Sequence, residues 1–257
     1  MALDSRFVLP IVMCVLAPFV GSFLGLLAVR LPGRRDVISG RSRCDRCGAT
    51  LRARDIVPFA SWLLLRGRCR YCGEPIGMFA PFMEISALAL AAWAALATTG
   101  CVLIATCLFG WILLTLAATD WRAFLLPDAL TLPLAVLGFL AALAFDRDGL
   151  LDHLIGGAAG FIVLAAIAFA YRRLRGRDGL GLGDAKLLGA VGMWVAWQGL
   201  LTVVLYAAIA ALAVILARAL LGQAPSATMR IPFGAYLAAG AWLVWLYGPL
   251  SLSANPG

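Results

Sequence analysis

The sequence predicts an all-α integral membrane protein of about eight transmembrane helices, with a cytoplasmic four-cysteine insertion between helices 1 and 2. Hydrophobic residues make up 63% of the 257 residues, whereas a soluble domain holds about 45–50%. A spanning helix uses roughly 20 residues, so the composition leaves room for about eight spans. Only 13% of residues are charged. That fraction excludes a disordered chain or a nucleic-acid partner despite a net charge of +8.

The expected spans are apolar stretches separated by short polar segments. They are residues 7–29, 80–99, 101–119, 130–145, 153–171, 186–197, 199–217 and 232–249. The first stretch is too long for a removable signal peptide and lacks its positive leader and small-residue cleavage site, so we interpret it as a span.

The basic residues predict the orientation of these spans. If residues 1–6 face outward, the inward segments are 30–79, 120–129, 172–185 with the adjoining Lys186, and 218–231. These segments hold nineteen of the 21 Lys and Arg, and only Arg6 and Arg147 face outward. Because cytoplasmic loops carry the positive charge, the inward segments are expected in the cytoplasm. We interpret the arginine clusters as topology determinants that also attract the anionic lipid bilayer.

The seven cysteines fall into two groups. Cys14, Cys101 and Cys107 lie singly in apolar stretches, where cysteine usually acts as a small hydrophobic residue. The other four form two Cys-x-x-Cys pairs in the only long polar segment, and they are Cys44, Cys47, Cys69 and Cys72. A glycine follows the second cysteine of each pair, as in a zinc knuckle. The doubled spacing indicates a metal site.

Four thiolates form a closed tetrahedral shell that suits a structural Zn²⁺ and leaves no open catalytic position. A reducing cytoplasm favours metal binding, although two disulfides or four free thiols are the alternatives. A polar segment of this size has few large apolar groups, so the metal would contribute much of its folding free energy.

Two of the scarce carboxylates lie where predicted spans meet the cytoplasm. Asp120 ends the third span, and Asp184 begins the sixth in Gly181-Leu-Gly-Asp184. The topology therefore brings both to the same depth on the same side. An ionisable group at membrane depth is a functional hypothesis by default. Taken singly, either Asp is better explained as a helix cap or an interface residue than as a catalyst, and Asp128 after Pro127 could equally be an N-cap.

As a pair, the two carboxylates would have the chemistry of an aspartic protease. Two like charges in a poorly hydrated cleft share one proton and titrate as a unit. The ionised partner can then activate water while the protonated one donates to the carbonyl oxygen. Gly181 and Gly183 would let the extended backbone of a substrate approach closely.

Short motifs follow one another along nearly the whole chain. They are Gly21-Ser-Phe-Leu, Arg30-Leu-Pro32, the doubled Cys-x-x-Cys, Val57 through Cys69, Pro81-Phe-Met-Glu84, Asp120, Leu126-Pro-Asp128, Leu130-Thr-Leu-Pro133, Gly181-Leu-Gly-Asp184 with Ala-Lys186, and Ile231-Pro-Phe-Gly234. In this order they resemble the motifs of the prepilin peptidase family, the aspartic endopeptidases with a G-x-G-D motif that process type IV pilins and type II secretion pseudopilins.

The resemblance implies that Asp120 and Asp184 are the catalytic aspartates. It adds Asp128, Lys186, Glu84 and the two glycines Gly181 and Gly183 as supporting or substrate-binding residues. The implied reaction is cleavage of a short basic leader on the cytoplasmic side of the bacterial inner membrane.

The resemblance further implies N-methylation of the new amino terminus with S-adenosylmethionine, associated with the cysteine region. The family commonly has Asn where this chain has Gly25, so a methyl-donor contact through that amide would be absent. The implied organisation is a first transmembrane helix at 1–29, a zinc-binding, methyltransferase-associated region at 30–79 and a polytopic peptidase domain at 80–257. The sequence does not indicate the oligomeric state.

Two other functions fit parts of the pattern. A small-solute transporter could use the two Asp as proton or cation sites among glycine-rich helices. A noncatalytic assembly scaffold could dock cytosolic partners on its zinc module. The first predicts uptake coupled to the membrane potential, and the second predicts that Asp120→Ala and Asp184→Ala membranes still support assembly.

Overall fold

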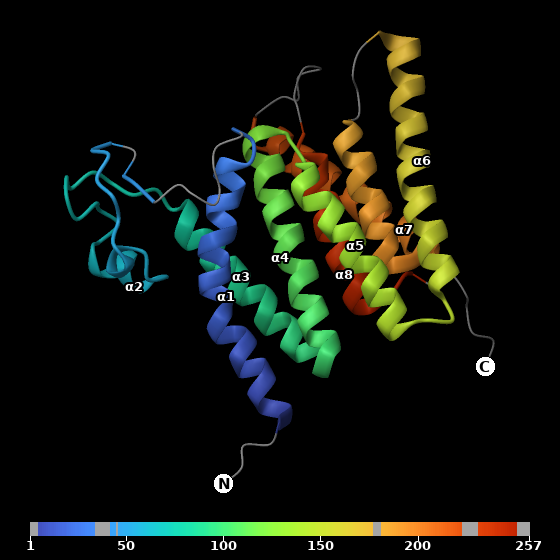
Figure 1. The fold of residues 1–257 in the computed structure, drawn as a ribbon. Helices are drawn as coiled ribbons and strands as arrows, with labels where there is room; N and C mark the ends of the chain where they lie inside the picture. The colour runs from blue at the N-terminus through green and yellow to red at the C-terminus, as the bar shows by residue number, and fades with distance from the viewer. Residues whose placement is uncertain (1–4, 34–41, 45, 177–180, 223–230, 251–257) are drawn as a thin grey trace. The chain divides into compact units, whose positions relative to one another are not determined.

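The structure is a computed structural model that describes residues 5–33, 42–44, 46–176, 181–222 and 231–250. These residues form helices and connecting turns (Figure 1). Within the described ranges there is no strand, and the only β pairing is two isolated bridges, Arg43 with Thr50 and Arg68 with Pro75. Residues 34–41, 177–180 and 223–230 belong to three of the predicted inward segments and lie outside the described part.

The helices follow the apolar stretches of the sequence. They are α1 (Ser5–Arg30), the 3₁₀ helix η1 (Ala53–Asp55), α2 (Ala60–Leu64), α3 (Phe79–Ala97), α4 (Gly100–Ala123), α5 (Asp128–Phe145), α6 (Leu150–Arg175), α7 (Leu182–Leu220) and α8 (Phe233–Tyr247). Six of them are long and apolar enough to cross a membrane: α1 and α3 through α7. α8 is a shorter apolar helix. The fold class is confirmed, and the chain is a multi-pass membrane protein.

α7 accounts for two of the eight predicted spans. It runs for 39 residues, but its backbone breaks at Ala196, where φ is 55° and ψ is −179°. Ala196 lies near the end of the first of the two predicted stretches, 186–197 and 199–217. A non-glycine residue with a positive φ is uncommon and is held by its surroundings.

The chain divides into two compact units, Met1–Thr115 and Leu116–Gly257. In the first unit α1 packs closely on α3. A Cβ added at Gly21 would lie 2.7 Å from the carbonyl oxygen of Met83 and 2.8 Å from the Cβ of Ala87. Only a glycine fits at this crossing. The domain boundaries expected from the sequence, at residues 29 and 79, stay a prediction.

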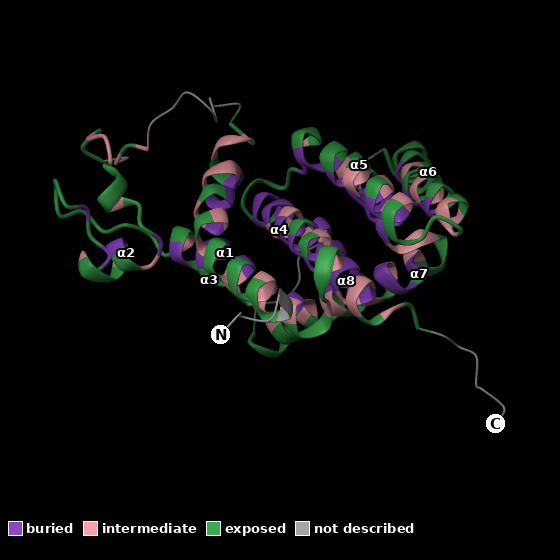
Figure 2. Ribbon diagram, turned by 60° about the horizontal axis from the view of Figure 1, so that its bottom comes forward, coloured by how far each residue is buried: buried purple, intermediate pink, exposed green. Residues whose placement is uncertain are grey.

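In the second unit α7 packs against α5, α6 and α8. Glycines permit the closest approach, because a Cβ at Gly160 would lie 2.6 Å from the carbonyl oxygen of Leu188. Within this unit α5, α7 and α8 begin at the end where α4 finishes (Figure 1). Apart from the side that packs on α7, α6 is largely exposed (Figure 2). Its exposed apolar residues include Phe161, Ile162 and Phe169, which would face lipid.

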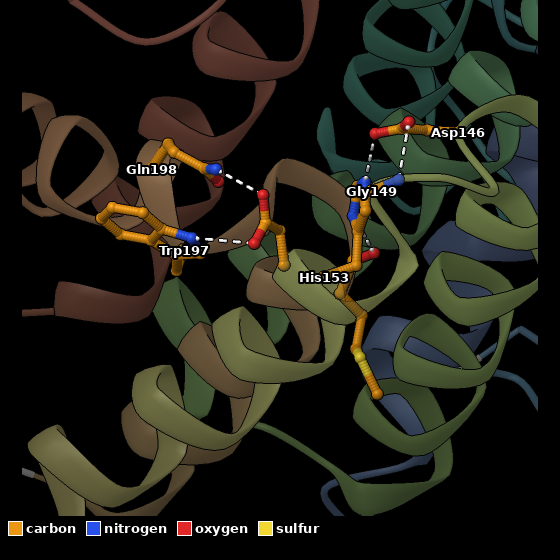
Figure 3. Close-up of polar contacts among 7 residues, drawn as sticks. Asp146, Gly149, His153, Trp197 and Gln198 are labelled. Atoms are coloured by element: carbon orange, nitrogen blue, oxygen red, sulfur yellow. Dashed lines mark hydrogen bonds and ion pairs between the residues drawn. The ribbon is translucent and has the colours of Figure 1, made fainter.

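Polar contacts secure the break in α7 at the other end of this unit (Figure 3). In the ring of His153, Nδ1 lies 3.0 Å from the carbonyl oxygen of Met193, and Nε2 lies 3.3 Å from the carboxylate of Asp146. After the break, Trp197 Nε1 donates to the carboxylate of Asp152 at 3.2 Å, and Gln198 Nε2 donates to it at 2.7 Å. The start of α6 therefore holds α7 on both sides of Ala196.

Candidate active site and metal centre

Asp120 lies in the last turn of α4 and is 6% exposed. The backbone N–H of Ala235 donates a hydrogen bond of 3.0 Å to its Oδ2. Ala235 is in the first turn of α8, where backbone N–H groups have no partner within the helix. The positive end of the α8 dipole therefore faces this carboxylate.

Gly234 makes this contact possible. A Cβ at Gly234 would lie 3.0 Å from Oδ2 of Asp120 and 2.8 Å from Cδ1 of Leu126. Any side chain here would displace the carboxylate or the leucine, so the position requires glycine for space.

Asp184 is the third residue of α7 and is 9% exposed. Its backbone N–H donates a hydrogen bond of 3.0 Å to the carbonyl oxygen of Gly181. A Cβ at Gly181 would lie 3.4 Å from Oδ2 of Asp184. The carboxylate therefore lies over the beginning of α7, where the helix dipole favours negative charge.

Leu126 lies between the two aspartate-bearing segments. Its Cβ would be 3.2 Å from a Cβ added at Gly183, and its methyl groups border Gly234. The carboxylates of Asp120 and Asp184 are near enough to influence each other electrostatically. The second unit thus brings together the two aspartates that the sequence pairs.

This arrangement can perform acid–base chemistry. Two largely buried carboxylates, each at a helix terminus, can hold one proton between them and act on one water molecule. In the same unit, a cavity of about 170 Å³ is lined by residues from the end of α4, the later part of α7 and the start of α8, among them Trp121, Phe124, Arg218 and Tyr236.

Asp128 and Lys186 form an ion pair close to the aspartates in sequence. Nζ of Lys186 donates to both carboxylate oxygens of Asp128, at 2.7 and 2.8 Å. The pair joins the first residue of α5 to the first turns of α7. Both side chains are about half exposed, so the contact contributes little to stability, about 0–1 kcal/mol.

Glu84 lies in the first unit, on α3. It is buried, and its Oε2 accepts a 2.9 Å hydrogen bond from the backbone N–H of Phe59. Phe59 precedes α2 and has a positive φ of 56°. Glu84 therefore attaches the segment between the cysteine pairs to the beginning of α3.

The four cysteines of the two Cys-x-x-Cys pairs come together in the first unit. The sulfur atoms of Cys44, Cys47, Cys69 and Cys72 all lie within 4.8 Å of one another. Those of Cys44 and Cys72 are 3.9 Å apart. A Zn–S bond of about 2.3 Å in a tetrahedron places sulfur atoms about 3.8 Å apart. The donor set fits a closed Cys₄ metal site.

The two cysteine turns have the same backbone bonding. In each, the N–H of the glycine (Gly48 or Gly73) donates a hydrogen bond of 2.9 Å to the carbonyl oxygen of the first cysteine. Both glycines have φ near +70°, the left-handed conformation that glycine adopts at least cost. In the first turn, the backbone N–H groups of Cys47 and Arg46 lower the pKa of the Cys44 thiol to about 7. Such a thiol is readily available as a thiolate ligand.

Asp55 connects the segment between the pairs to the second turn. Its carboxylate accepts from Arg70 Nε at 2.6 Å, from the hydroxyl of Tyr71 at 3.0 Å and from the N–H of Arg52 at 3.0 Å. These donors, the Arg52 N–H first, hold the pKa of Asp55 below its ordinary value. The side chain is only 2% exposed.

Sequence reasoning missed the supporting roles of Asp55, Leu126, Gly234 and Ala235. The motif Ile231-Pro-Phe-Gly234 was a signal for the last two, because a glycine after a helix-starting proline suggests a close approach. Asp55 had no signal, since its three partners are brought together only by folding.

Two family models match the chain. The model of the bacterial peptidase A24 N-terminal domain matches residues 15–98, and that of the type IV leader peptidase family matches residues 107–216. A prepilin leader peptidase/N-methyltransferase of Burkholderia pseudomallei is 42% identical over 224 residues, which cover 85% of this chain and 71% of that protein.

The chain belongs to the type IV leader peptidase family. Other members of the family with the same descriptive name come from Aeromonas hydrophila and Dickeya chrysanthemi. The first is 39% identical over a match that covers 81% of this chain and 72% of the relative. The second is 38% identical over a match that covers 90% of this chain and 80% of the relative. No solved structure matches the chain.

Proposed function

We propose that this chain is a prepilin leader peptidase and N-methyltransferase. It cleaves the basic leader from type IV prepilins or type II secretion pseudopilins and methylates the new amino terminus. One observation supports the peptidase half: Asp120 and Asp184 are both largely buried, at the ends of two different helices of one unit. The relatives named above support the same pair of activities.

In the proposed reaction one carboxylate is ionised and the other carries the shared proton. The ionised group takes a proton from water as the water oxygen attacks the scissile carbonyl carbon. The protonated group donates to the carbonyl oxygen, which gives a neutral tetrahedral diol. As the diol collapses and the C–N bond breaks, the carboxylate that is now ionised takes a proton from one diol hydroxyl, and the carboxyl that took the proton from water delivers it to the leaving amine.

The chain's own residues would position the dyad and the substrate. The N–H of Ala235 fixes one oxygen of Asp120 and leaves the other for water. The apolar helix of the precursor would stay in lipid while its leader reaches the aspartates, so that membrane anchoring supplies much of the orientation. Asp128, paired with Lys186, would help to hold the beginnings of α5 and α7 in place for binding of the leader.

For the cofactors, we propose a structural Zn²⁺ held by Cys44, Cys47, Cys69 and Cys72, and S-adenosylmethionine as methyl donor. Next to the cysteines is a cavity of about 460 Å³ lined by Arg43, Arg46, Leu51, Glu74, Ile76 and Gly77. Gly25 packs on α3, because a Cβ added there would lie 3.4 Å from Met83 Cγ.

The proposed location is the bacterial inner membrane with the aspartates at its cytoplasmic face. The placement of nineteen of the 21 basic residues in the inward segments supports this orientation. A transporter remains the second function that the sequence admits, but the relatives above are described as peptidases and methyltransferases.

The test is to incubate the purified protein with a prepilin, with and without S-adenosylmethionine, and to determine the mass of the product. We expect loss of the leader in both cases, and a gain of one methyl group only with the donor. Asp120→Asn and Asp184→Asn should abolish cleavage, whereas Asp148→Asn, an exposed carboxylate on the outer loop, should not. Wild-type cleavage by either dyad variant would refute the assignment.

A further inference from the structure

The short helix α2 turns two leucines away from the rest of its unit. Ser61 is buried and its hydroxyl donates to the carbonyl oxygen of Val57 at 2.6 Å. Trp62 packs on Gly67, where an added Cβ would lie 3.0 Å from the indole ring. In contrast, Leu63 is 71% exposed and Leu64 is 81% exposed.

The apolar surface extends beyond these two leucines. Ile56 and Val57, just before α2, are 47% and 42% exposed. Exposed arginines occur on both sides of this segment, and they are Arg52, Arg54, Arg66 and Arg68. We call Ile56, Val57, Leu63 and Leu64 with these four arginines the α2 patch. Adjacent apolar and basic side chains are typical of surfaces that lie in the membrane interface.

The hydrogen bond between Phe59 and Glu84 determines where α2 begins. Glu84 is the sixth residue of α3, about 8 Å along the helix from its first residue. Phe59 directly precedes α2 and is held at that level by a 2.9 Å contact. α2 therefore starts beside the second turn of a spanning helix. Met78, which directly precedes α3, and Phe82 in its first turn are 62% and 59% exposed.

We propose that the α2 patch docks on the bilayer surface. Leu63 and Leu64 enter the boundary between headgroups and acyl chains, and the arginines contact the phosphate groups of anionic lipids. Arginine suits this position because its long stem can lie along apolar groups while the guanidinium reaches the headgroups. This contact is separate from the chemistry of the aspartates and from the metal ligands.

The observations favour a lipid surface over a second copy of the chain. Two α2 patches facing each other would bring eight arginines together without acids to neutralise them. Asp55, the acid nearest to α2 in sequence, already binds Arg70 and Tyr71. The hydrogen bond to Glu84 also keeps the start of α2 beside the second turn of α3, a helix long and apolar enough to cross a membrane.

The decisive experiment is photocrosslinking of the full-length protein in vesicles of phosphatidylcholine and phosphatidylglycerol. A benzophenone amino acid replaces Leu64 in one variant and Arg46, an exposed residue of the first cysteine turn, in the control. We expect a phospholipid adduct from position 64, stronger with the anionic lipid, and little from position 46. Equal adducts at both positions, no lipid adduct at 64, or a crosslinked dimer would overturn the proposal.

A second measurement separates docking from folding. Leu63→Ser/Leu64→Ser should keep the metal content of the wild type, and in vesicles trypsin should cut it faster after Arg66 and Arg68. Leu96→Ser, at the far end of α3 and 90% exposed, is the matched control and should not change that rate. An unchanged cleavage rate in the double variant with full metal content would contradict docking.

Discussion

Ala235 donates the hydrogen bond that holds Asp120, although 115 residues separate them along the chain. The contact exists because the first turn of α8 lies against the last turn of α4. Asp184 approaches from a third helix terminus, the beginning of α7. The candidate active site is therefore built from helix ends, where unpaired backbone N–H groups can stabilise negative charge.

Gly234→Ala should impair cleavage strongly while the protein stays folded. The new methyl group would lie 3.0 Å from Oδ2 of Asp120 and 2.8 Å from Leu126, so one of them must move. Overpacking of this kind costs about 1–3 kcal/mol, and a shift of the catalytic carboxylate should lower kcat by about tenfold or more.

Gly77→Ala provides the control for Gly234→Ala, because an added Cβ there meets nothing within 4 Å. Leader cleavage by this variant should match that of the wild type. A Gly234→Ala enzyme with an unchanged kcat would show that the contact between α8 and Asp120 does not matter for the reaction.

Asp128→Asn and Lys186→Gln should each reduce cleavage several-fold through KM and leave the unfolding temperature almost unchanged. Both side chains are about half exposed, and such pairs contribute about 0–1 kcal/mol to stability. Because each change removes the same ion pair, the double variant should be little worse than either single variant. Complete loss of turnover in Asp128→Asn would mean that Asp128, not one of its neighbours, belongs to the dyad.

The cysteine cluster should hold one zinc ion per chain. Cys69→Ser should abolish metal binding, since a three-thiol shell no longer closes the tetrahedron, and should lower the stability of the segment between α1 and α3. Cys101→Ser, an exposed cysteine outside the cluster, should keep the metal. Elemental analysis and thermal unfolding measure both effects, and unchanged stability after complete chelation would refute a structural role.

His153→Leu should destabilise the second unit without changing kcat. The substitution leaves the Met193 carbonyl and the Asp146 carboxylate without their ring partner, at a cost of about 1–3 kcal/mol. A lower unfolding temperature is expected, with unaltered turnover below it. Leu154→Ala, the partly exposed neighbour, is the comparison, and a His153→Leu protein as stable as this one would contradict the structural role of the ring.

The sequence was sufficient for the helices and for placing Asp120 and Asp184 at helix ends, whereas their pairing as a catalytic dyad stays a prediction. Apolar stretches at membrane length must become helices because lipid offers no partner for the backbone, and counting spans then places both aspartates on one side. The count could not reveal that two stretches share α7, because the break at Ala196 depends on contacts with α6 rather than on a proline or glycine. Nor could it reveal the partners of Asp120 and Asp55, which come from distant positions.

The glycine contacts between α6 and α7 bear on how inactive mutants of this protein should be interpreted. α7 begins with Asp184, so anything that pushes α7 away from its neighbour also moves that aspartate. A methyl group at Gly160 would do so, since it would collide with the backbone at Leu188. A random screen for loss of processing should therefore recover glycine positions of α6, a helix without any proposed catalytic group, and these hits would report helix spacing rather than substrate recognition.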